Sequence, residues 1–154
     1  MRKLVIAIRK NYGAYSTGGF NVVTIEQGRV FLCLEEAIVK SSKKTLLYLL
    51  EPTGKTIKAA KEAFFVLQPE VLSGKVIALT GADDYNISRE VWKQIIVGCG
   101  GEYNRKVTRQ TSFLVMSEKL AHDENLFSTK RWAAEKLGVP CVTYFDFYKM
   151  FESS

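Results

Sequence analysis

The hydrophobic positions of the first 72 residues come mainly in short continuous runs, which is the pattern of buried strands. These runs predict strands over residues 4–8, 20–25, 29–34 and 45–50. Between the first two, residues 11–19 hold three glycines with Asn, Ser and Thr, which predicts a loop. Gln27-Gly28 predicts a tight turn between the second and third strands.

Two segments within residues 1–72 have patterns that predict helices. Residues 56–67 repeat apolar side chains at a spacing near 3.5 residues, and Gln68-Pro69 ends the pattern because the residue before a proline avoids helical angles. Residues 35–40 predict a short helix. Residues 1–72 are therefore expected to form a small α/β or β-rich region of unknown fold.

From residue 73 onward, predicted strands and helices alternate. Strands are expected at 75–79, 103–107, 112–116 and 140–142, and helices at 88–99, 128–137 and from 143 onward. Residues 117–127 are polar and predict a loop. Such alternation indicates a parallel sheet covered on its faces, so the fold class is α/β, with a second domain at 73–154.

Two residue types are expected to lie mainly in the core. Trp92 and Trp132 stand on the apolar sides of their predicted helices. Cys33, Cys99 and Cys141 are far apart and odd in number, and His122 has no Cys or His near it. This spacing predicts reduced, mostly buried thiols rather than a disulfide framework or a metal site.

The positive charge lies mostly in the first half. Of the formal net charge of +6, residues 1–72 carry +5, with 11 Lys+Arg and 6 Asp+Glu, and residues 73–154 carry +1. The isoelectric point is about 9.2. A basic chain of this kind suits a polyanionic partner such as nucleic acid. No apolar run reaches the roughly 18–20 residues of a membrane span, and the run at 4–8 is too short for a signal peptide.

Two short polar segments are candidates for a binding site. Thr80-Gly81 follows a predicted strand, and Ser128-Thr129-Lys130 opens a predicted helix. In parallel sheets, ligands bind at the carboxyl ends of strands near helix N-termini, where anions are favoured. The two segments are therefore expected to meet and to bind phosphate.

The ordered set of motifs from Ser73 to about Glu152 resembles a BRCT domain. The matching features are Gly74-Lys75-Val76, Thr80-Gly81, Gly100-Gly101, the strand at 111–115, Lys130, and Val142-Thr143 before an aromatic helix. The resemblance implies a four-stranded parallel sheet flanked by helices. The first 72 residues resemble no family.

Two residues narrow the resemblance to one subgroup. Phe147 stands where many members have tryptophan, and Arg89 stands eleven residues before Gly100. Both features are similar to the BRCT domains of bacterial NAD-dependent DNA ligases and of the large subunit of the eukaryotic clamp loader. That likeness implies that Thr80, Gly81, Arg89 and Lys130 bind the 5′-phosphate of DNA ends or nicks.

The resemblance also carries alternatives for the function. Related domains read phosphoserine or phosphothreonine with the same pocket, and others bind proteins without any phosphate, so a protein-interaction module is the rival interpretation. The chain could also be an accessory piece of a larger replication or repair enzyme. The ligase-like character favours a place in the cytoplasm or nucleoid, or in the nucleus if the source is eukaryotic.

Each candidate residue has an alternative role. Thr80 could simply cap or turn the chain, and Lys130 could be a solvated helix lysine. Arg89 could pair with Asp83 or Asp84, two carboxylates that would repel a phosphate. A basic cluster is a candidate for contact with the DNA backbone, although a solvated loop is the simpler interpretation. The cluster consists of Arg105, Lys106 and Arg109.

The sequence indicates no catalytic machinery. Gly54-Lys55-Thr56 matches the end of a phosphate-binding P-loop, but the glycine that this motif needs at position 49 is Leu49. With a single histidine, no Ser/His/acid set is recognisable, and no carboxylate pair is distinctive. The chain is expected to be a non-enzymatic module without a cofactor.

Overall fold

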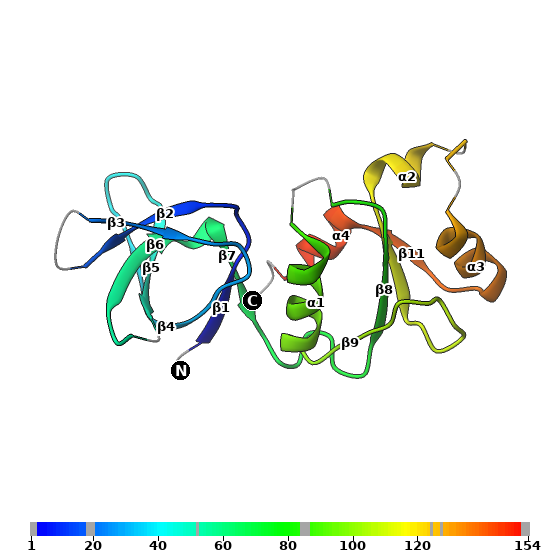
Figure 1. Cartoon of the computed structure of the whole chain (residues 1–154), viewed down its shortest axis with the longest axis horizontal. Coiled ribbons are helices and arrows are strands. Elements are labelled where there is room, and N and C mark those ends of the chain that lie inside the picture. The colour runs from blue at the N-terminus through cyan, green and yellow to red at the C-terminus, as the bar shows by residue number, and fades with distance from the viewer. Residues whose placement is uncertain are drawn as a thin grey trace. The chain divides into compact units, whose positions relative to one another are not determined.

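The computed structural model describes residues 3–17, 21–51, 53–83, 87–123, 125–126 and 128–151. The chain divides into two compact units, residues 1–68 (unit 1) and residues 69–154 (unit 2), and each unit is described by itself. Figure 1 labels the helices and strands of both units.

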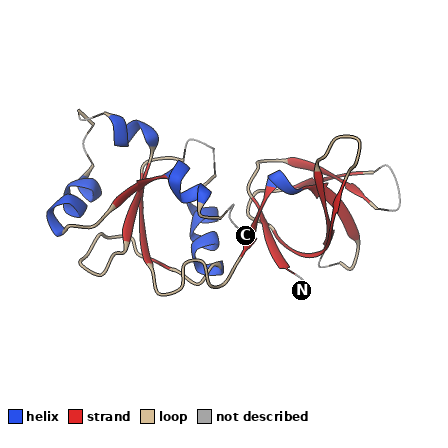
Figure 2. Cartoon of the chain, turned by 180° about the vertical axis from the view of Figure 1, so that it is seen from behind, coloured by secondary structure: helices blue, strands red, loops and turns tan. Residues whose placement is uncertain are grey.

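Unit 1 is built from strands. In its described part they are β1 (Lys3–Ala7), β2 (Tyr12–Ser16), β3 (Val22–Ile25), β4 (Val30–Ile38), β5 (Thr45–Leu50), β6 (Thr56–Ala60) and β7 (Phe64–Leu67), with a 3-10 turn at Lys61–Ala63. They pair antiparallel in the order β3-β2-β6-β5-β4-β1-β7. Figure 2 shows the sheet curling around its own interior.

The strands of unit 1 alternate between buried and outward positions, as a sheet with one buried face requires. In β6, Ile57 and Ala59 are buried while their neighbours are partly exposed. One core cluster joins all seven strands and the 3-10 turn: Val5, Ala7, Ala14, Ile25, Phe31, Cys33, Leu47, Leu49, Ile57, Ala59, Ala63 and Phe64. The β-rich alternative for the first region is therefore confirmed, and the α/β alternative is wrong for its described residues.

Three local predictions for unit 1 are wrong. Residues 56–67 form β6, the 3-10 turn and β7 instead of a helix, and residues 35–40 mostly continue β4. Residues 12–16 of the predicted loop form β2, while Gly18 and Gly19 lie outside the described residues. The spacing of apolar residues in 56–67 fits a helix as well as two strands joined by a tight turn. Pairing of β6 with both β5 and β2 decides for strands.

Unit 2 alternates strands and helices. Its elements are β8 (Val76–Thr80), α1 (Arg89–Gly98), β9 (Glu102–Tyr103), β10 (Phe113–Met116), α2 (Glu118–His122), α3 (Thr129–Leu137), β11 (Cys141–Thr143) and α4 (Tyr144–Lys149). The sheet is parallel, in the order β11-β10-β8-β9. The predicted four-stranded parallel sheet flanked by helices is confirmed.

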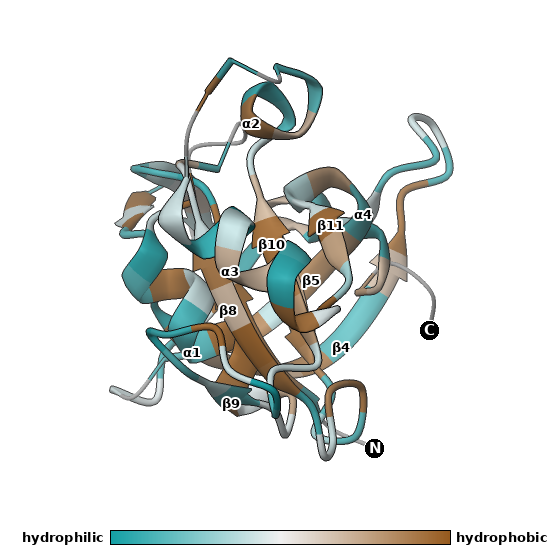
Figure 3. Ribbon diagram, turned by 90° about the vertical axis from the view of Figure 1, so that its right-hand side faces the viewer, coloured by the Kyte–Doolittle hydropathy of each residue, from teal (hydrophilic) through white to brown (hydrophobic). Residues whose placement is uncertain are grey.

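Helices cover both faces of this sheet. Trp92 of α1 stacks on Tyr144 and Phe147 of α4, with ring centroids 5.7 and 5.1 Å apart, and Phe147 also meets Phe113 of β10 at 5.7 Å. On the opposite face, Ala78 of β8 clusters with Leu120 of α2, Ala134 of α3 and further buried residues. Figure 3 shows the two central strands, β8 and β10, as strongly hydrophobic.

Several predictions for unit 2 need correction. Residues 118–122 of the predicted loop form α2, and Val107 lies beyond β9. Trp92 is fully buried as expected, but Trp132 is 54% exposed, with the Lys136 ammonium 4.5 Å from its ring centroid. Of the three thiols, Cys141 is exposed. Among the described residues, no helix is both long and apolar enough to cross a membrane.

The Gly100-Gly101 pair lets the segment before β8 pack against the end of α1. Gly100 has a φ of +84°, and a Cβ added there would lie 2.0 Å from the Pro69 carbonyl oxygen. The close approach is fixed by a hydrogen bond from the Leu72 N–H to the Cys99 carbonyl (2.9 Å). Glycine is therefore needed at position 100 for two reasons, its backbone angle and the lack of space for a side chain.

We expect Gly100→Ala to destabilise unit 2 more than Gly138→Ala does. Both glycines have left-handed backbone angles, which cost an alanine about 1–2 kcal/mol, but only Gly100 lacks room for a Cβ. Both tryptophans lie in unit 2, so tryptophan fluorescence during denaturant unfolding measures this unit. Equal losses of unfolding free energy in the two variants would show that the close approach to Pro69 is unimportant.

Candidate functional site

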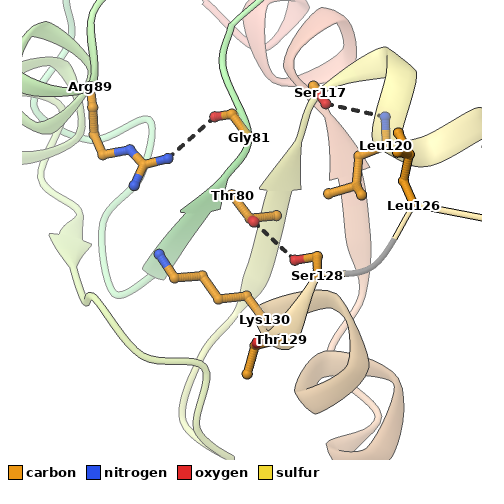
Figure 4. A pocket seen from close by; sticks show the side chains of 9 residues that line it. All are labelled: Thr80, Gly81, Arg89, Ser117, Leu120, Leu126, Ser128, Thr129 and Lys130. Atoms are coloured by element: carbon orange, nitrogen blue, oxygen red, sulfur yellow. Dashed lines mark hydrogen bonds between the residues drawn. The ribbon is translucent and has the colours of Figure 1, made fainter.

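A cavity of about 530 Å³ opens where β8 ends and α3 begins. Figure 4 shows the residues that line it: Thr80, Gly81, Arg89, Ser117, Leu120, Leu126, Ser128, Thr129 and Lys130. All four residues of the predicted phosphate site are among them. We call this cavity the β8–α3 pocket.

Two hydroxyl groups link the strand to the helix. The Thr80 Oγ1 and the Ser128 Oγ are 3.0 Å apart and share a hydrogen bond. Ser128 is also the N-cap of α3, because its Oγ accepts from the Arg131 N–H (3.2 Å). Both hydroxyls lie at the first turn of the helix, where the backbone N–H groups of Thr129 and Lys130 have no intrahelical acceptors.

Gly81 supplies the bend that opens the pocket. Its φ is +80°, and an added Cβ would lie 2.9 Å from the Ser117 Oγ, so a side chain would fill the space beside α2. Its carbonyl oxygen accepts from the Arg89 guanidinium (3.3 Å) and from the Tyr144 hydroxyl (3.2 Å). The bend is thus held from α1 and from α4 at once.

Lys130 reaches back from α3 to the end of β8. Its ammonium donates to the Leu79 carbonyl oxygen (2.8 Å). Burial lowers the pKa of Lys130 below its ordinary value, and the positive charges of Arg89, Arg105 and Lys93 lower this pKa further. The ammonium therefore lies in a positive field and is partly shielded from water.

Asp83 and Asp84 are the two carboxylates near the pocket that, from the sequence, would repel a phosphate. The buried Asp83 carboxylate accepts hydrogen bonds from the Trp92 indole N–H (2.9 Å) and the Ile87 N–H (3.3 Å). The alternative in which Arg89 pairs with Asp83 is wrong, since Arg89 donates to Gly81 instead. Asp84 lies outside the described residues. Among the described lining residues, none is acidic.

The basic cluster after β9 lies outside the pocket lining. Arg105, Lys106 and Arg109 are exposed, and none of them lines the cavity. Arg105 still acts on the pocket through its charge, because it is one of the groups that lower the pKa of Lys130. Contact of this cluster with a DNA backbone stays a prediction.

Sequence reasoning missed one polar residue of the pocket, Ser117. The polar segment 117–127, in which it lies, predicts a loop. Ser117 is the N-cap of α2, and its Oγ accepts from the Leu120 N–H (3.2 Å). A serine followed by Glu118 in a first turn is an N-cap signal, so α2 and with it Ser117 could have been found.

No group of three or more potential metal ligands gathers among the described residues. What the pocket offers instead is hydroxyl groups, backbone N–H groups at a helix start, one ammonium and one guanidinium. These are hydrogen-bond donors suited to an anion with several acceptor oxygens.

A comparison with protein-family models identifies the family of unit 2. Residues 67–151 match the model of the BRCA1 C Terminus (BRCT) domain. The chain belongs to the BRCT family. BRCT domains are typically non-catalytic modules that bind DNA or phosphorylated proteins.

Curated relatives point to DNA ligases. The chain is 30% identical over 114 residues to a DNA ligase of Prochlorococcus marinus (strain NATL2A), a match that covers 71% of this chain and 15% of the ligase. A DNA ligase of Akkermansia muciniphila is 35% identical over 79 residues, or 51% of this chain and 9% of that protein. The chain thus spans a small fraction of these relatives, which connect its BRCT domain to DNA replication and repair.

We expect Arg105→Gln to raise the pKa of Lys130, because it removes one of the positive charges that disfavour the ammonium. Arg109→Gln is the matched control, since Arg109 is also exposed and is not among those charges. NMR titration of the lysine Cε and Nζ resonances measures the effect. A Lys130 pKa that rises equally in both variants, or in neither, would contradict the electrostatic account.

Proposed function

We propose that the β8–α3 pocket binds the terminal 5′-phosphate of DNA at an end or a nick, and that the chain does so without catalysing a reaction. The observation that carries this proposal is the convergence of Thr80, Arg89, Ser128 and Lys130 on one cavity without an acidic residue among its described lining.

The cations of the pocket keep donors free for a ligand. The Lys130 ammonium has three N–H donors and gives one to Leu79, and the Arg89 guanidinium has five and gives one to Gly81. Both acceptors are neutral carbonyl groups, and within the described part of the chain neither cation forms an ion pair. These contacts orient the cations while their charge stays available to a phosphate.

Hydroxyl and backbone donors complete the proposed site. The hydroxyls of Thr80 and Ser128 currently bond to each other, and each can rotate to donate to a phosphate oxygen. The N-terminus of α3 adds its dipole and its free N–H groups. Charge-assisted bonds of about 1.5–3 kcal/mol each are together sufficient for micromolar binding after the cost of association.

Two facts favour DNA over a phosphopeptide as the ligand. The curated relatives are DNA ligases, so their names connect them to DNA. In addition, the whole net charge of +6 lies in unit 1, which has 11 Lys+Arg and 5 Asp+Glu, whereas unit 2 has 11 of each. A basic unit in the same chain as a phosphate pocket suits a polyanionic ligand, because it can neutralise backbone phosphates of that ligand.

We expect Thr80→Ala and Lys130→Ala to weaken binding of a 5′-phosphorylated nicked duplex, with Lys130→Ala losing about tenfold or more because it removes a charge-assisted bond. Fluorescence anisotropy at two salt concentrations, with duplexes that differ only in the 5′-phosphate, measures the preference. The matched control is Lys136→Ala, which removes a lysine of the same helix that does not line the pocket.

Three outcomes would overturn the proposal. Equal binding of both duplexes would leave only a basic surface. A preference that survives in Thr80→Ala and Lys130→Ala would place the phosphate elsewhere. Selective binding of a phosphothreonine peptide, with no preference among the duplexes, would make the chain a phosphoprotein reader.

A further inference from the structure

A second surface of interest lies on unit 1, where β2, β6 and β5 run side by side (Figure 1). We propose that the outer face of these three strands binds a single nucleic-acid strand, with tyrosine rings stacking on bases and lysines contacting phosphates. This site is distinct from the β8–α3 pocket and does not depend on it.

The face is defined by a row of three side chains across the strands. Tyr15 of β2 pairs with Lys58 of β6, which in turn pairs with Tyr48 of β5. Residues directly opposite each other on neighbouring antiparallel strands have Cβ atoms roughly 4.5–5.5 Å apart. The row therefore places a lysine between two tyrosines.

The row points away from the core of unit 1. The neighbours of its members along the strands are buried, with Ala14 1%, Ile57 1% and Leu47 fully covered. Because side chains alternate along a strand, Tyr15, Lys58 and Tyr48 lie on the opposite face. Tyr15 is 50% exposed, and the other two are partly exposed.

The polar groups of the three side chains form no hydrogen bond or ion pair with the residues of unit 1 that the structure describes. Neither tyrosine hydroxyl donates or accepts a hydrogen bond among the described residues, and the Lys58 ammonium makes no ion pair there. By contrast, Tyr12 on the inner side of β2 accepts from the Ala60 N–H (2.9 Å) and stacks edge-on against Phe64. Tyr12 therefore takes part in the core of the unit, whereas the rings and hydroxyl groups of Tyr15 and Tyr48 are available to a ligand as far as the described residues show.

Further lysines lie at both ends of the β5–β6 hairpin. Lys55 precedes β6, and Lys43 and Lys44 precede β5. None of these three makes an ion pair within the described part of the chain. With about 3.3 Å per strand residue, β6 and its flanking lysines extend over roughly 20 Å. Lysines thus lie at both ends of the hairpin and at the centre of the row, and one exposed carboxylate, Glu35 of β4, stands opposite Tyr48 at the edge of the face.

One end of the face is hollowed. A cavity of about 400 Å³ is lined by Lys43, Lys44, Thr45, Ala60, Lys61 and Glu62. The negative charge of Glu62 is compensated by an ion pair with Arg9 (3.7 Å). Lys61 forms an ion pair with Glu36 (3.4 Å). Lys43 and Lys44 are the cations left over for an anionic ligand.

The turn that presents these lysines has an uncommon backbone. Lys43 has a φ of +57°, in the left-handed region where glycine or asparagine is ordinary. Its N–H donates to the Val39 carbonyl (2.7 Å), and the Val39 N–H donates to the Lys44 carbonyl (2.8 Å). A lysine at this position keeps a charge at the mouth of the cavity, at some cost in backbone strain.

These features fit a single strand better than a duplex. In single-stranded complexes, bases stack on aromatic side chains and a positive groove follows the backbone. In a duplex the base faces are already stacked and cannot reach Tyr15 or Tyr48. The charge complementarity is strong, since the net charge of the whole chain resides in this unit.

The test uses the full chain and 5′-hydroxyl oligonucleotides, so that the terminal-phosphate pocket is not engaged. Fluorescence anisotropy compares the binding of four ligands: oligo-dT, an abasic strand of equal length, a blunt duplex and oligo-U. The strands have about 12 nucleotides, because a usual site covers roughly 4–16 nucleotides. We expect oligo-dT to bind more tightly than the abasic strand or the duplex. Comparison with oligo-U shows whether DNA or RNA is preferred.

Variants separate stacking from charge. Tyr15→Ala and Tyr48→Ala should each weaken oligo-dT binding by about fivefold or more and leave the abasic strand unchanged, while Tyr15→Phe and Tyr48→Phe retain the rings and the affinity. Lys58→Gln should weaken both strands and lower the salt slope by about 0.7. Phe145→Ala is the matched control, an exposed aromatic of unit 2 with the Lys149 ammonium 4.2 Å from its ring centroid.

The proposal is overturned if oligo-dT and the abasic strand bind equally, if the duplex binds as tightly as oligo-dT, or if Phe145→Ala costs as much as Tyr15→Ala. The first two comparisons use the unmodified chain, so they decide even if a tyrosine variant fails to fold. The terminal-phosphate proposal survives any of these results, because its own test depends on 5′-phosphorylated duplexes and Lys130.

Discussion

The hydrogen bond from the Lys130 ammonium to the Leu79 carbonyl is the contact on which the site depends. It joins the end of β8 to the first turn of α3 across about 50 residues of sequence, together with the shared bond of Thr80 and Ser128. Parallel topology makes this possible, because β8 ends on the same edge of the sheet at which the following helices begin. Without these links, the cavity between strand and helix would lose both its shape and its charge.

The same contacts set the electrostatics of the pocket. Carbonyl oxygens orient Lys130 and Arg89, and no carboxylate among the described residues pairs with either cation. Asp83, the described acid in the loop after β8, accepts a hydrogen bond from Trp92. Burial lowers the pKa of Lys130, and the positive charges of Arg89, Arg105 and Lys93 lower this pKa further. A phosphate would relieve this repulsion, which gives the pocket a physical reason to prefer an anion.

Much of unit 2 could be predicted from its sequence, because local signals and tertiary structure agree there. The sequence predicts a helix from residue 88 and strands at the apolar runs 75–79 and 112–116, and the structure contains α1, β8 and β10 there. Thr80, Gly81 and Lys130 follow from chain position, since they stand at a strand end and at a helix start, whereas Arg89 follows from the resemblance to the ligase and clamp-loader type. That Asp83 points away from the pocket depends on side-chain packing around Trp92, which no local pattern reveals.

Several elements of unit 1 could not be predicted from the sequence, because local signals and tertiary structure disagree there. The apolar spacing of residues 56–67 suits a helix, and the glycines near β2 suit a loop, yet strand pairing outweighs both preferences. Its outer Tyr15–Lys58–Tyr48 row exists only through the register of the β5–β6 hairpin with β2, a strand from a distant part of the sequence. Such a surface cannot be found until the pairing is known.

The most direct test of the central claim is a map of backbone amide shifts by NMR when the chain is titrated with a short oligonucleotide, with and without a 5′-phosphate. The account predicts that the phosphate adds shifts concentrated at Gly81, Thr129 and Lys130, where strand end and helix start converge. If the phosphorylated and unphosphorylated strands give the same shifts at these amides, the pocket is not the phosphate site.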